Sequence, residues 1–375
     1  MGQGGRPRRR VRADREPARV IPPRVLDVAP SLPETPAYLY DLPALDEHAA
    51  AVRRAMGATE VYYAVKANPD AELLRVLAGH VDGFEVSSGG EHAHVTGLFP
   101  GTPVALGGPG KTDAELRLPH HRIHVESPNE LRRLLATGLE ADVLLRLNPD
   151  LPVEGAALTM SGPFGMDEAG VAECLPLFGE RVRLRGLHTH LASGLAAGQL
   201  LTLAETLLGT EHEEVNLGGG MAVSYDRPES RFDWAAYGAG LAALRRGRRL
   251  RIEPGRALTA YCGYYVTRVV DVKRVRGEAY AIVLGGTHHL RTPVTKGHDQ
   301  PLTILPTGAG PGVTGEPLTV VGQLCTPKDV FSRNIVTSAR VGDTVVFEMA
   351  GAYAWNISHH DFLMHPKPSF HYLRA

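Results

Sequence analysis

Short runs of β-branched and apolar residues alternate with helical stretches from about residue 59 to residue 256. Apolar positions in the helical stretches, for example 70–78 and 129–136, recur every three or four residues, which is typical of amphipathic helices. Strands that alternate with helices predict βα units and a parallel sheet. The strand-like runs are 59–66, 83–88, 103–107, 122–127, 142–148, 182–191, 212–218 and 250–254. Because eight strands close a (β/α)8 TIM barrel, the sequence predicts that fold.

The pattern changes after Arg256. Strand-like runs follow one another without a convincing helix and are separated by turns rich in glycine and proline, at 261–275, 278–284, 317–325 and 342–349. We therefore expect a barrel over residues 37–256 and an antiparallel β-domain over residues 257–375 that contributes to the active site. The proline-rich stretch 21–36 is expected to add an edge strand to this β-domain, which would bring the two ends of the chain together.

The composition is that of a globular protein, with 43% hydrophobic and 22% charged residues in 375. The net charge of −1 argues against nucleic acid or an anionic membrane and favours a small molecule as the partner. Seven arginines lie in residues 1–20, where the lack of large apolar residues predicts a disordered basic tail. No apolar run indicates a secretion signal or a membrane span, and three cysteines without paired spacing indicate the reducing cytoplasm.

The functional side chains of a TIM barrel lie at the carboxyl ends of its strands. The candidate residues that this chain has there are Lys66, Arg146, His190, Ser193, Gly218, Gly219, Gly220, Glu253 and Arg256. The glycines and Arg256 follow the seventh and eighth predicted strands, where such barrels hold a phosphate group. A lysine opposite a phosphate site suits pyridoxal 5'-phosphate (PLP), because its aldehyde requires an amine.

Six motifs along the chain occur in the order of a known family. They are YAVKANP around Lys66, GLHTHLASG around His190, LGGG at 217–220, EPGR at 253–256, GQLCTPKD around Cys325 and GAYAWN around Tyr353. Together they resemble the fold-type III PLP-dependent decarboxylases, the group that holds diaminopimelate and ornithine decarboxylases. The resemblance covers residues 37–375 and implies an alanine racemase-like barrel followed by a β-domain.

The resemblance implies a role for each matching residue. Lys66 would form the Schiff base, His190 would stack on the pyridine ring, and Glu253 would lie against the pyridine nitrogen and keep it protonated. Cys325 would protonate the α-carbon after CO₂ leaves, reaching in from the other subunit of a homodimer with shared active sites, with Asp329 nearby as a substrate ligand. The residues expected to hold the phosphate are Ser193, Gly218, Gly219, Gly220, Arg256 and Tyr353.

Two departures from the family pattern concern the substrate. Thr326 follows the cysteine where decarboxylases of diamino acids have an acid for the distal ammonium, and Pro163 stands where a lysine is common. The β-domain instead offers His289 and Arg291, whose donors suit carboxylates, so we expect an anionic distal group on the substrate. Arg146 is either a further substrate ligand or a structural ion-pair residue.

These features look most like the branch of the family that serves carboxylate-siderophore biosynthesis. Enzymes of that branch decarboxylate 2,3-diaminopropionate already joined to citrate, as in staphyloferrin B assembly. The alternatives are a meso-diaminopimelate decarboxylase of lysine biosynthesis and a decarboxylase of a carrier-bound amino acid.

Two other classes of protein stay open. No metal is expected, but a metal protein would use the histidines at 288, 289, 298, 359, 360 and 365, although their spacing matches no closed zinc pattern. A non-catalytic PLP-binding regulator is the other alternative, and the presence of Lys66, Glu253 and Cys325 argues against it.

Overall fold

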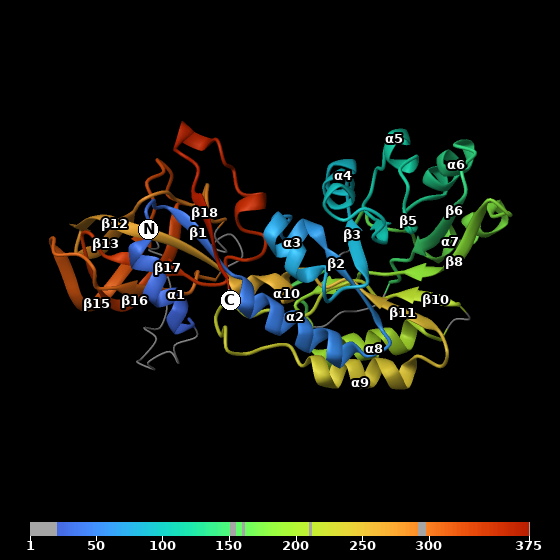
Figure 1. The fold of residues 1–375 in the computed structure, drawn as a ribbon, viewed down its shortest axis with the longest axis horizontal. Coiled ribbons are helices and arrows are strands. Elements are labelled where there is room, and N and C mark those ends of the chain that lie inside the picture. Colours follow the sequence, from blue (N-terminus) through green and yellow to red (C-terminus); the bar gives the residue numbers. More distant parts are fainter. Residues whose placement is uncertain (1–20, 151–154, 160–161, 210–211, 292–297, 375) are drawn as a thin grey trace, which may run out of the picture.

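The structure, a computed structural model, describes residues 21–374 apart from 151–154, 160–161, 210–211 and 292–297. A barrel lies at the right of Figure 1 and a sheet-rich domain at its left. The predicted basic tail at 1–20 lies outside the described residues. Across the described ranges, we find no helix with the length and apolar character needed to cross a bilayer.

Parallel strands close the barrel in the order β10-β11-β2-β3-β4-β5-β6-β8, a count of eight within the described residues. Their bounds are β2 Glu60–Ala64, β3 Gly83–Val86, β4 Val104–Leu106, β5 Arg122–Val125, β6 Ala141–Arg146, β8 Val182–His188, β10 Glu214–Asn216 and β11 Arg249–Ile252. Each of the eight predicted runs overlaps one of these strands, with β6 and β11 beginning one residue earlier than predicted, so the predicted TIM barrel is confirmed.

Helices alternate with these strands around the barrel (Figure 1). The longer ones are α2 Leu42–Met56, α3 Ala71–Leu77, α4 Gly89–Leu98, α6 Pro128–Ala136, α7 Glu168–Cys174, α8 Ala197–Leu207 and α9 Trp234–Leu244, and α5 Asp113–Leu116 and α10 Arg256–Thr259 are short. Several begin at a polar side chain that accepts from the first free N–H groups, such as Asp70 for α3, Ser88 for α4 and Ser127 for α6. These caps fix the residue at which each loop ends and its helix begins.

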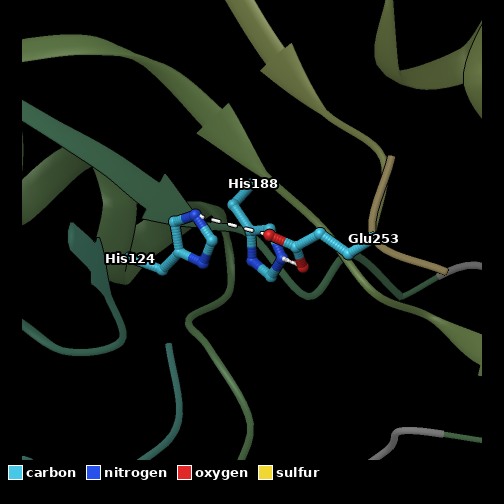
Figure 2. Close-up of side chains that lie close together, drawn as sticks. All are labelled: His124, His188 and Glu253. Atoms are coloured by element: carbon cyan, nitrogen blue, oxygen red, sulfur yellow. Dashed lines mark hydrogen bonds and ion pairs between the residues drawn. The ribbon is translucent and has the colours of Figure 1, made fainter. Parts of the chain in front are cut away.

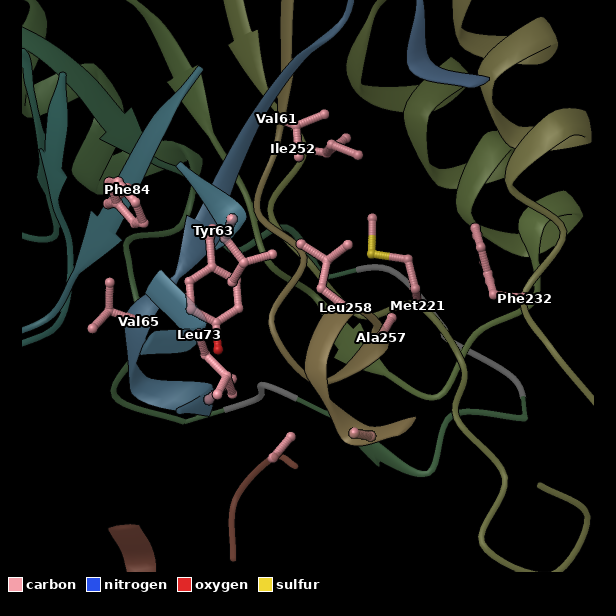
Figure 3. Packing of buried hydrophobic residues seen from close by; sticks show 14 of the residues in the cluster. Val61, Tyr63, Val65, Leu73, Phe84, Met221, Phe232, Ile252, Ala257 and Leu258 are labelled. Carbon is pink, nitrogen blue, oxygen red and sulfur yellow. The ribbon is translucent and has the colours of Figure 1, made fainter. Parts of the chain in front are cut away.

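Buried ion pairs close the amino end of the barrel. The Arg251 guanidinium is fully buried and lies 2.6 Å from Glu60 and 2.8 Å from Glu214, and Arg122 lies 2.8 Å from Glu214 as well. Val61 of β2 and Ile252 of β11, which are register partners, alternate with these charged residues and face the helices around the barrel (Figure 3). Charged side chains therefore occupy the interior at the amino end, and the carboxyl end is left for a ligand.

The second domain is a sheet built around the long strand β12 Gly263–Val275. Its other strands are β1 Ala37–Asp41, β13 Glu278–Val283, β14 Leu302–Leu305, β15 Gly312–Val321, β16 Val330–Arg340, β17 Thr344–Phe347 and β18 Ser369–Leu373. Most pairs are antiparallel, as predicted, but β13 pairs with β15 and β1 pairs with β18 in parallel. The sheet is therefore mixed.

The amino-terminal segment differs from the prediction. Residues 21–36 form no edge strand, because they contain five prolines, which lack the amide donor of a ladder, and Pro22–Pro23 instead start helix α1 Pro23–Val28. The strand that joins the β-domain is β1 at 37–41, whereas the sequence predicts that these residues belong to the barrel. Tyr38 stacks on Phe370 at 5.5 Å between ring centroids, so this part of β1 packs against β18 near the other end of the chain.

Candidate active site

A cavity of about 960 Å³ opens at the carboxyl ends of the barrel strands and is lined by residues of both domains. Its volume lies at the upper end of the range of about 300–1,000 Å³ for small-molecule sites. The predicted site residues that line it are Lys66, Arg146, His190, Ser193, Gly219, Gly220, Glu253, Arg256, Arg291 and Tyr353. Residues predicted from separate stretches of sequence thus meet around one space.

Lys66 lies on a short turn, η2 Val65–Ala67, directly after β2. Its Nζ lies 2.6 Å from Oε2 of Glu85, and the Ser87 hydroxyl donates to the other oxygen of that carboxylate. Burial lowers the pKa of Lys66, but the charges of Glu85 and Glu253 and the Tyr353 phenol oppose this effect, and the net pKa is raised. The Glu85 carboxylate therefore favours the ammonium form of the Lys66 amine.

The glycine run after β10 packs closely against neighbouring backbone. A Cβ on Gly218 would lie 2.4 Å from the Thr189 carbonyl oxygen, and a Cβ on Gly220 would lie 2.3 Å from the Ala192 carbonyl oxygen. Both glycines have positive φ angles, +65° and +104°, which side chains disfavour. Gly218 does not line the cavity itself, but its carbonyl accepts from the Glu253 N–H and so joins the glycine loop to the loop after β11.

Glu253 is buried and both of its carboxylate oxygens accept hydrogen bonds. The His188 Nε2 lies 3.1 Å from Oε2, and the Asn216 Nδ2 donates to Oε1 at 2.6 Å. Figure 2 shows that His124 lies beside His188 against the same carboxylate. The two imidazole rings are stacked, with centroids 4.0 Å apart.

A neutral ring and a phenol face the same space. Burial and the positive charges of Lys66 and Arg146 lower the pKa of His190 to about 4, so this imidazole is neutral at pH 7. Its Nδ1 accepts from the Gly219 N–H, which fixes the ring plane. Tyr353 has a φ of +50° and its N–H donates to the Ala67 carbonyl, which ties the β-domain to the lysine turn.

Three arginines line the cavity, and they differ in their interaction partners. Arg146 donates to Glu126 at 2.7 Å and lies over the Phe164 ring, so it is ion-paired and faces the cavity at once. Arg256 donates to the Tyr225 hydroxyl at 2.7 Å and lies 4.5 Å from the centroid of the Tyr353 ring. The backbone of Arg291 is held by the Ser358 hydroxyl, and its side chain is exposed to the cavity.

Besides Gly218, four predicted residues do not line the cavity of the same chain. Cys325 is exposed, in the loop 322–329 between β15 and β16, and Thr326 follows it. The Asp329 carboxylate is buried and accepts from the N–H groups of Thr287 and Leu324, which makes it an organiser of this loop. His289 is also buried, within hydrogen-bond distance of the Tyr265 hydroxyl and the Pro366 carbonyl.

Sequence reasoning missed several residues of the site. Glu85, the partner of Lys66, is the one charged residue inside the predicted strand 83–88, and a carboxylate inside an apolar run was a usable signal. His188 precedes His190 by two residues and was also recognisable, since alternate residues of a strand share a face. Tyr225 and His298 line the cavity with rings stacked at 4.6 Å, and nothing in their loop sequences predicted this.

One trio of residues has the spacing of a metal site. Among the described residues, His124, His188 and Glu253 are the group whose donor atoms lie within 4.8 Å of one another. The histidines of the β-domain that we considered as metal ligands are not part of it.

The residues around the cavity fit PLP. An amine, a glycine loop with no space for Cβ atoms, a buried carboxylate and a neutral imidazole meet the needs of its aldehyde, phosphate, pyridine nitrogen and ring face. Lys66, the glycine loop with Ser193, Glu253 and His190 would hold these four parts, in that order.

Comparisons with known proteins agree with a PLP site. The family model for the pyridoxal binding domain of pyridoxal-dependent decarboxylases matches residues 42–260. A 2-[(L-alanin-3-ylcarbamoyl)methyl]-2-hydroxybutanedioate decarboxylase from Staphylococcus aureus is 38% identical and covers 90% of this chain and 93% of its own length. A diaminopimelate decarboxylase from Deinococcus radiodurans is 32% identical over 89% of each chain.

The fold is also found in solved structures. A crystal structure of diaminopimelate decarboxylase from Helicobacter pylori complexed with L-lysine superposes with a TM-score of 0.82 at 22% identity, covering 92% of this chain and 93% of that one. The barrel with its following β-domain is therefore shared beyond close relatives. From the family match, the sequence identities and the cavity, the chain belongs to the PLP-dependent amino acid decarboxylases and binds PLP through its barrel domain.

Proposed function

We propose that this enzyme decarboxylates a 2,3-diaminopropionate unit joined by an amide bond to citrate. The observation that carries the proposal is the charge of the cavity. Arg291 lines it, and among the described residues no carboxylate lies within ion-pair distance of its guanidinium. The other charged residues that line it are Lys66, Glu85, Arg146, Asp226, Glu253 and Arg256. Lys66 pairs with Glu85, Arg146 with Glu126 and Glu253 with His188, Asp226 has a partner of its own, and Arg256 keeps the phosphate role that the resemblance implies. A distal ammonium would face the Arg291 cation, whereas a distal carboxylate would be bound by it.

The name of the Staphylococcus aureus relative supports the same substrate. A 2-hydroxybutanedioate carries two carboxylates and a hydroxyl, and its carbamoylmethyl arm bears the alanine unit that loses CO₂. These are the groups that arginine, histidine and tyrosine donors bind. Arg291, His298 and the Tyr225 hydroxyl lie on the cavity wall and are the residues that we assign to this distal part, whereas Arg256 is kept for the PLP phosphate.

The chain's own residues perform the binding and proton handling. When bound, PLP supplies an aldehyde that captures the substrate amine and a ring that accepts the electron pair left when CO₂ departs. Glu85 holds a proton at Lys66 Nζ, and Glu253 is an anion suited to a protonated ring nitrogen. Phe164 and Met349 contribute apolar side chains to the cavity wall, which limit the access of water to the reacting carbon.

The α-carbon must receive a proton once CO₂ has left, and we assign this step to Cys325 of a second copy of the chain. Its thiol is exposed and does not line its own cavity, so it can act only in the cavity of another subunit. Mixing the inactive Lys66→Ala variant with the slow Cys325→Ala variant should give more activity than either variant alone, because a mixed dimer contains one intact site. Failure to restore activity in a mixture shown to exchange subunits would contradict the shared site.

The substrate is tested by CO₂ release from the PLP-loaded enzyme. Citryl-2,3-diaminopropionate, meso-diaminopimelate, ornithine and arginine are compared under identical conditions. We expect CO₂ release from the citryl compound. Arg291→Ala should raise the KM for this compound and should have less effect on the reaction of a small substrate without a charged distal group. CO₂ release from meso-diaminopimelate alone would contradict the proposal. The enzyme would then be a meso-diaminopimelate decarboxylase, whose substrate also carries a carboxylate at its distal end.

A further inference from the structure

A set of polar residues with no assigned role lies directly behind Glu253. His188 is at the end of β8, Asn216 at the end of β10 and His124 on β5, and all three are at most 4% exposed. The Asn216 Oδ1 accepts from the Gly218 N–H, so its amide must point Nδ2 at Glu253. Asn216 therefore couples the glycine loop to the carboxylate, and the position of one depends on the other.

The protonation of His188 follows from its surroundings. Burial, followed by the positive charge of Arg146, lowers its pKa well below the ordinary value, so the imidazole is neutral and carries one N–H. Glu253 is an acceptor, and the His188 Nδ1 has no partner among the described residues. The single proton is therefore on Nε2, which donates to Glu253 Oε2.

His124 occupies a different position in the same group. Its Nε2 lies 3.7 Å from Glu253 Oε1, too far for a hydrogen bond, and it faces the Asn216 Nδ2 at 3.4 Å. Its ring lies parallel to His188, with 9° between the planes. Imidazole lone pairs lie in the ring plane, so the two rings point side by side and do not converge on one ion as tetrahedral zinc ligands do. Of the two imidazoles, it is His188 that hydrogen-bonds to the Glu253 carboxylate, and the arrangement does not favour a metal ion.

We propose that His188 and Asn216 are positioning residues for the decarboxylation, which hold Glu253 as an anion aimed at the ring nitrogen of PLP. Each supplies one N–H to one carboxylate oxygen, which stabilises the charged form and prevents rotation of the carboxylate. His124 is a packing neighbour without a hydrogen bond to Glu253. The inference rests on the PLP chemistry of the family and is independent of which amino acid is the substrate.

The test measures the dissociation constant of PLP with the apoprotein, by titration of the visible absorption of bound cofactor, so no substrate is required. His188→Phe keeps the ring and its stacking but removes the N–H, and it should weaken PLP binding by about 10- to 100-fold, the effect of one hydrogen bond to a charged group. His188→Gln restores a donor and should recover most of this loss. His124→Phe is the matched control and should change the constant by no more than about twofold.

A double-mutant cycle separates positioning from packing. If His188 acts through Glu253, His188→Phe should have little effect, within about twofold, in a Glu253→Gln background. Thermal unfolding of each apoprotein checks that the variants fold. The proposal is overturned if the losses from His188→Phe and Glu253→Gln simply multiply, if His188→Gln binds PLP as weakly as His188→Phe, or if His124→Phe weakens binding as much as His188→Phe.

Discussion

Glu85 controls when Lys66 is able to react. Only a neutral amine attacks an aldehyde, and the Glu85 carboxylate favours the ammonium form of Lys66. Glu85→Gln keeps the shape of the side chain and removes its charge. The pKa of Lys66 then falls, because the Glu85 charge that raises it is gone while desolvation still disfavours the cation. We therefore expect the apoprotein of Glu85→Gln to form its covalent bond with PLP faster than the native apoprotein at pH 8.

The magnitude follows from the 2.6 Å separation of Lys66 Nζ and Glu85 Oε2. Coulomb's law with an effective dielectric constant of about 20 gives an attraction of about 6 kcal/mol. The Lys66 side chain is 40% exposed, and screening by water leaves about 1 kcal/mol of this attraction. Since each 1.4 kcal/mol is a factor of ten, the neutral fraction of Lys66 should rise about fivefold.

The assay is stopped-flow mixing of apoprotein with PLP, followed by visible absorption at several pH values. The rate of the native protein should climb with pH, and the curve of Glu85→Gln should be displaced to lower pH. Glu91→Gln is the matched control, since Glu91 is a nearby half-buried carboxylate that accepts from the Ser87 N–H. An equal or slower rate for Glu85→Gln at every pH would refute the assignment of Glu85 as the group that keeps Lys66 protonated.

Three further changes test other parts of the molecule. Gly220→Ala places a Cβ 2.3 Å from a carbonyl oxygen at positive φ and should lower both Tm and PLP affinity, whereas Gly198→Ala, with open space around its Cβ, should stabilise the protein by about 0.4–1 kcal/mol. Cys325→Ala should slow product formation while the dissociation constant of PLP is unchanged. Burial lowers the pKa of His120 to about 4, so the unfolded chain binds a proton below pH 6.5 that the folded chain does not. Its contribution to stability should therefore fall by up to about 2 kcal/mol between pH 7 and pH 5, and His120→Gln should remove this part of the pH dependence.

Each of these expectations has a contrary outcome. Native-like Tm and PLP binding in Gly220→Ala would mean that the loop after β10 can move aside. A fully active Cys325→Ala would mean that another group delivers the proton to the α-carbon. Parallel curves of urea-unfolding free energy against pH for the native protein and His120→Gln would mean that His120 titrates alike in both states.

Local pattern alone determined most of the barrel. The eight strands and the spacing of the helices are readable because each βα unit is short and repeats one alternation of apolar runs and caps. Motifs at strand ends also indicated Lys66, the glycine run and Glu253, since the carboxyl ends of parallel strands in a closed barrel must meet at one face. The sequence pattern predicts the β-domain less well. Strand β16 contains Ser332, Arg333 and Asn334 and pairs with β15 with register shifts, so its alternation of apolar and polar residues is broken.

Only the tertiary structure decided which distant residues meet. It joined β1 to β12 and β18, a pairing across most of the chain that no local pattern encodes. It also paired Lys66 with Glu85, set His188 and Asn216 behind Glu253, and left Cys325 outside the cavity of its own chain. These outcomes depend on side-chain distances of a few ångströms across separate elements. A sequence specifies such distances only through the packing of the whole fold, because each strand end is positioned by its neighbours in the closed barrel.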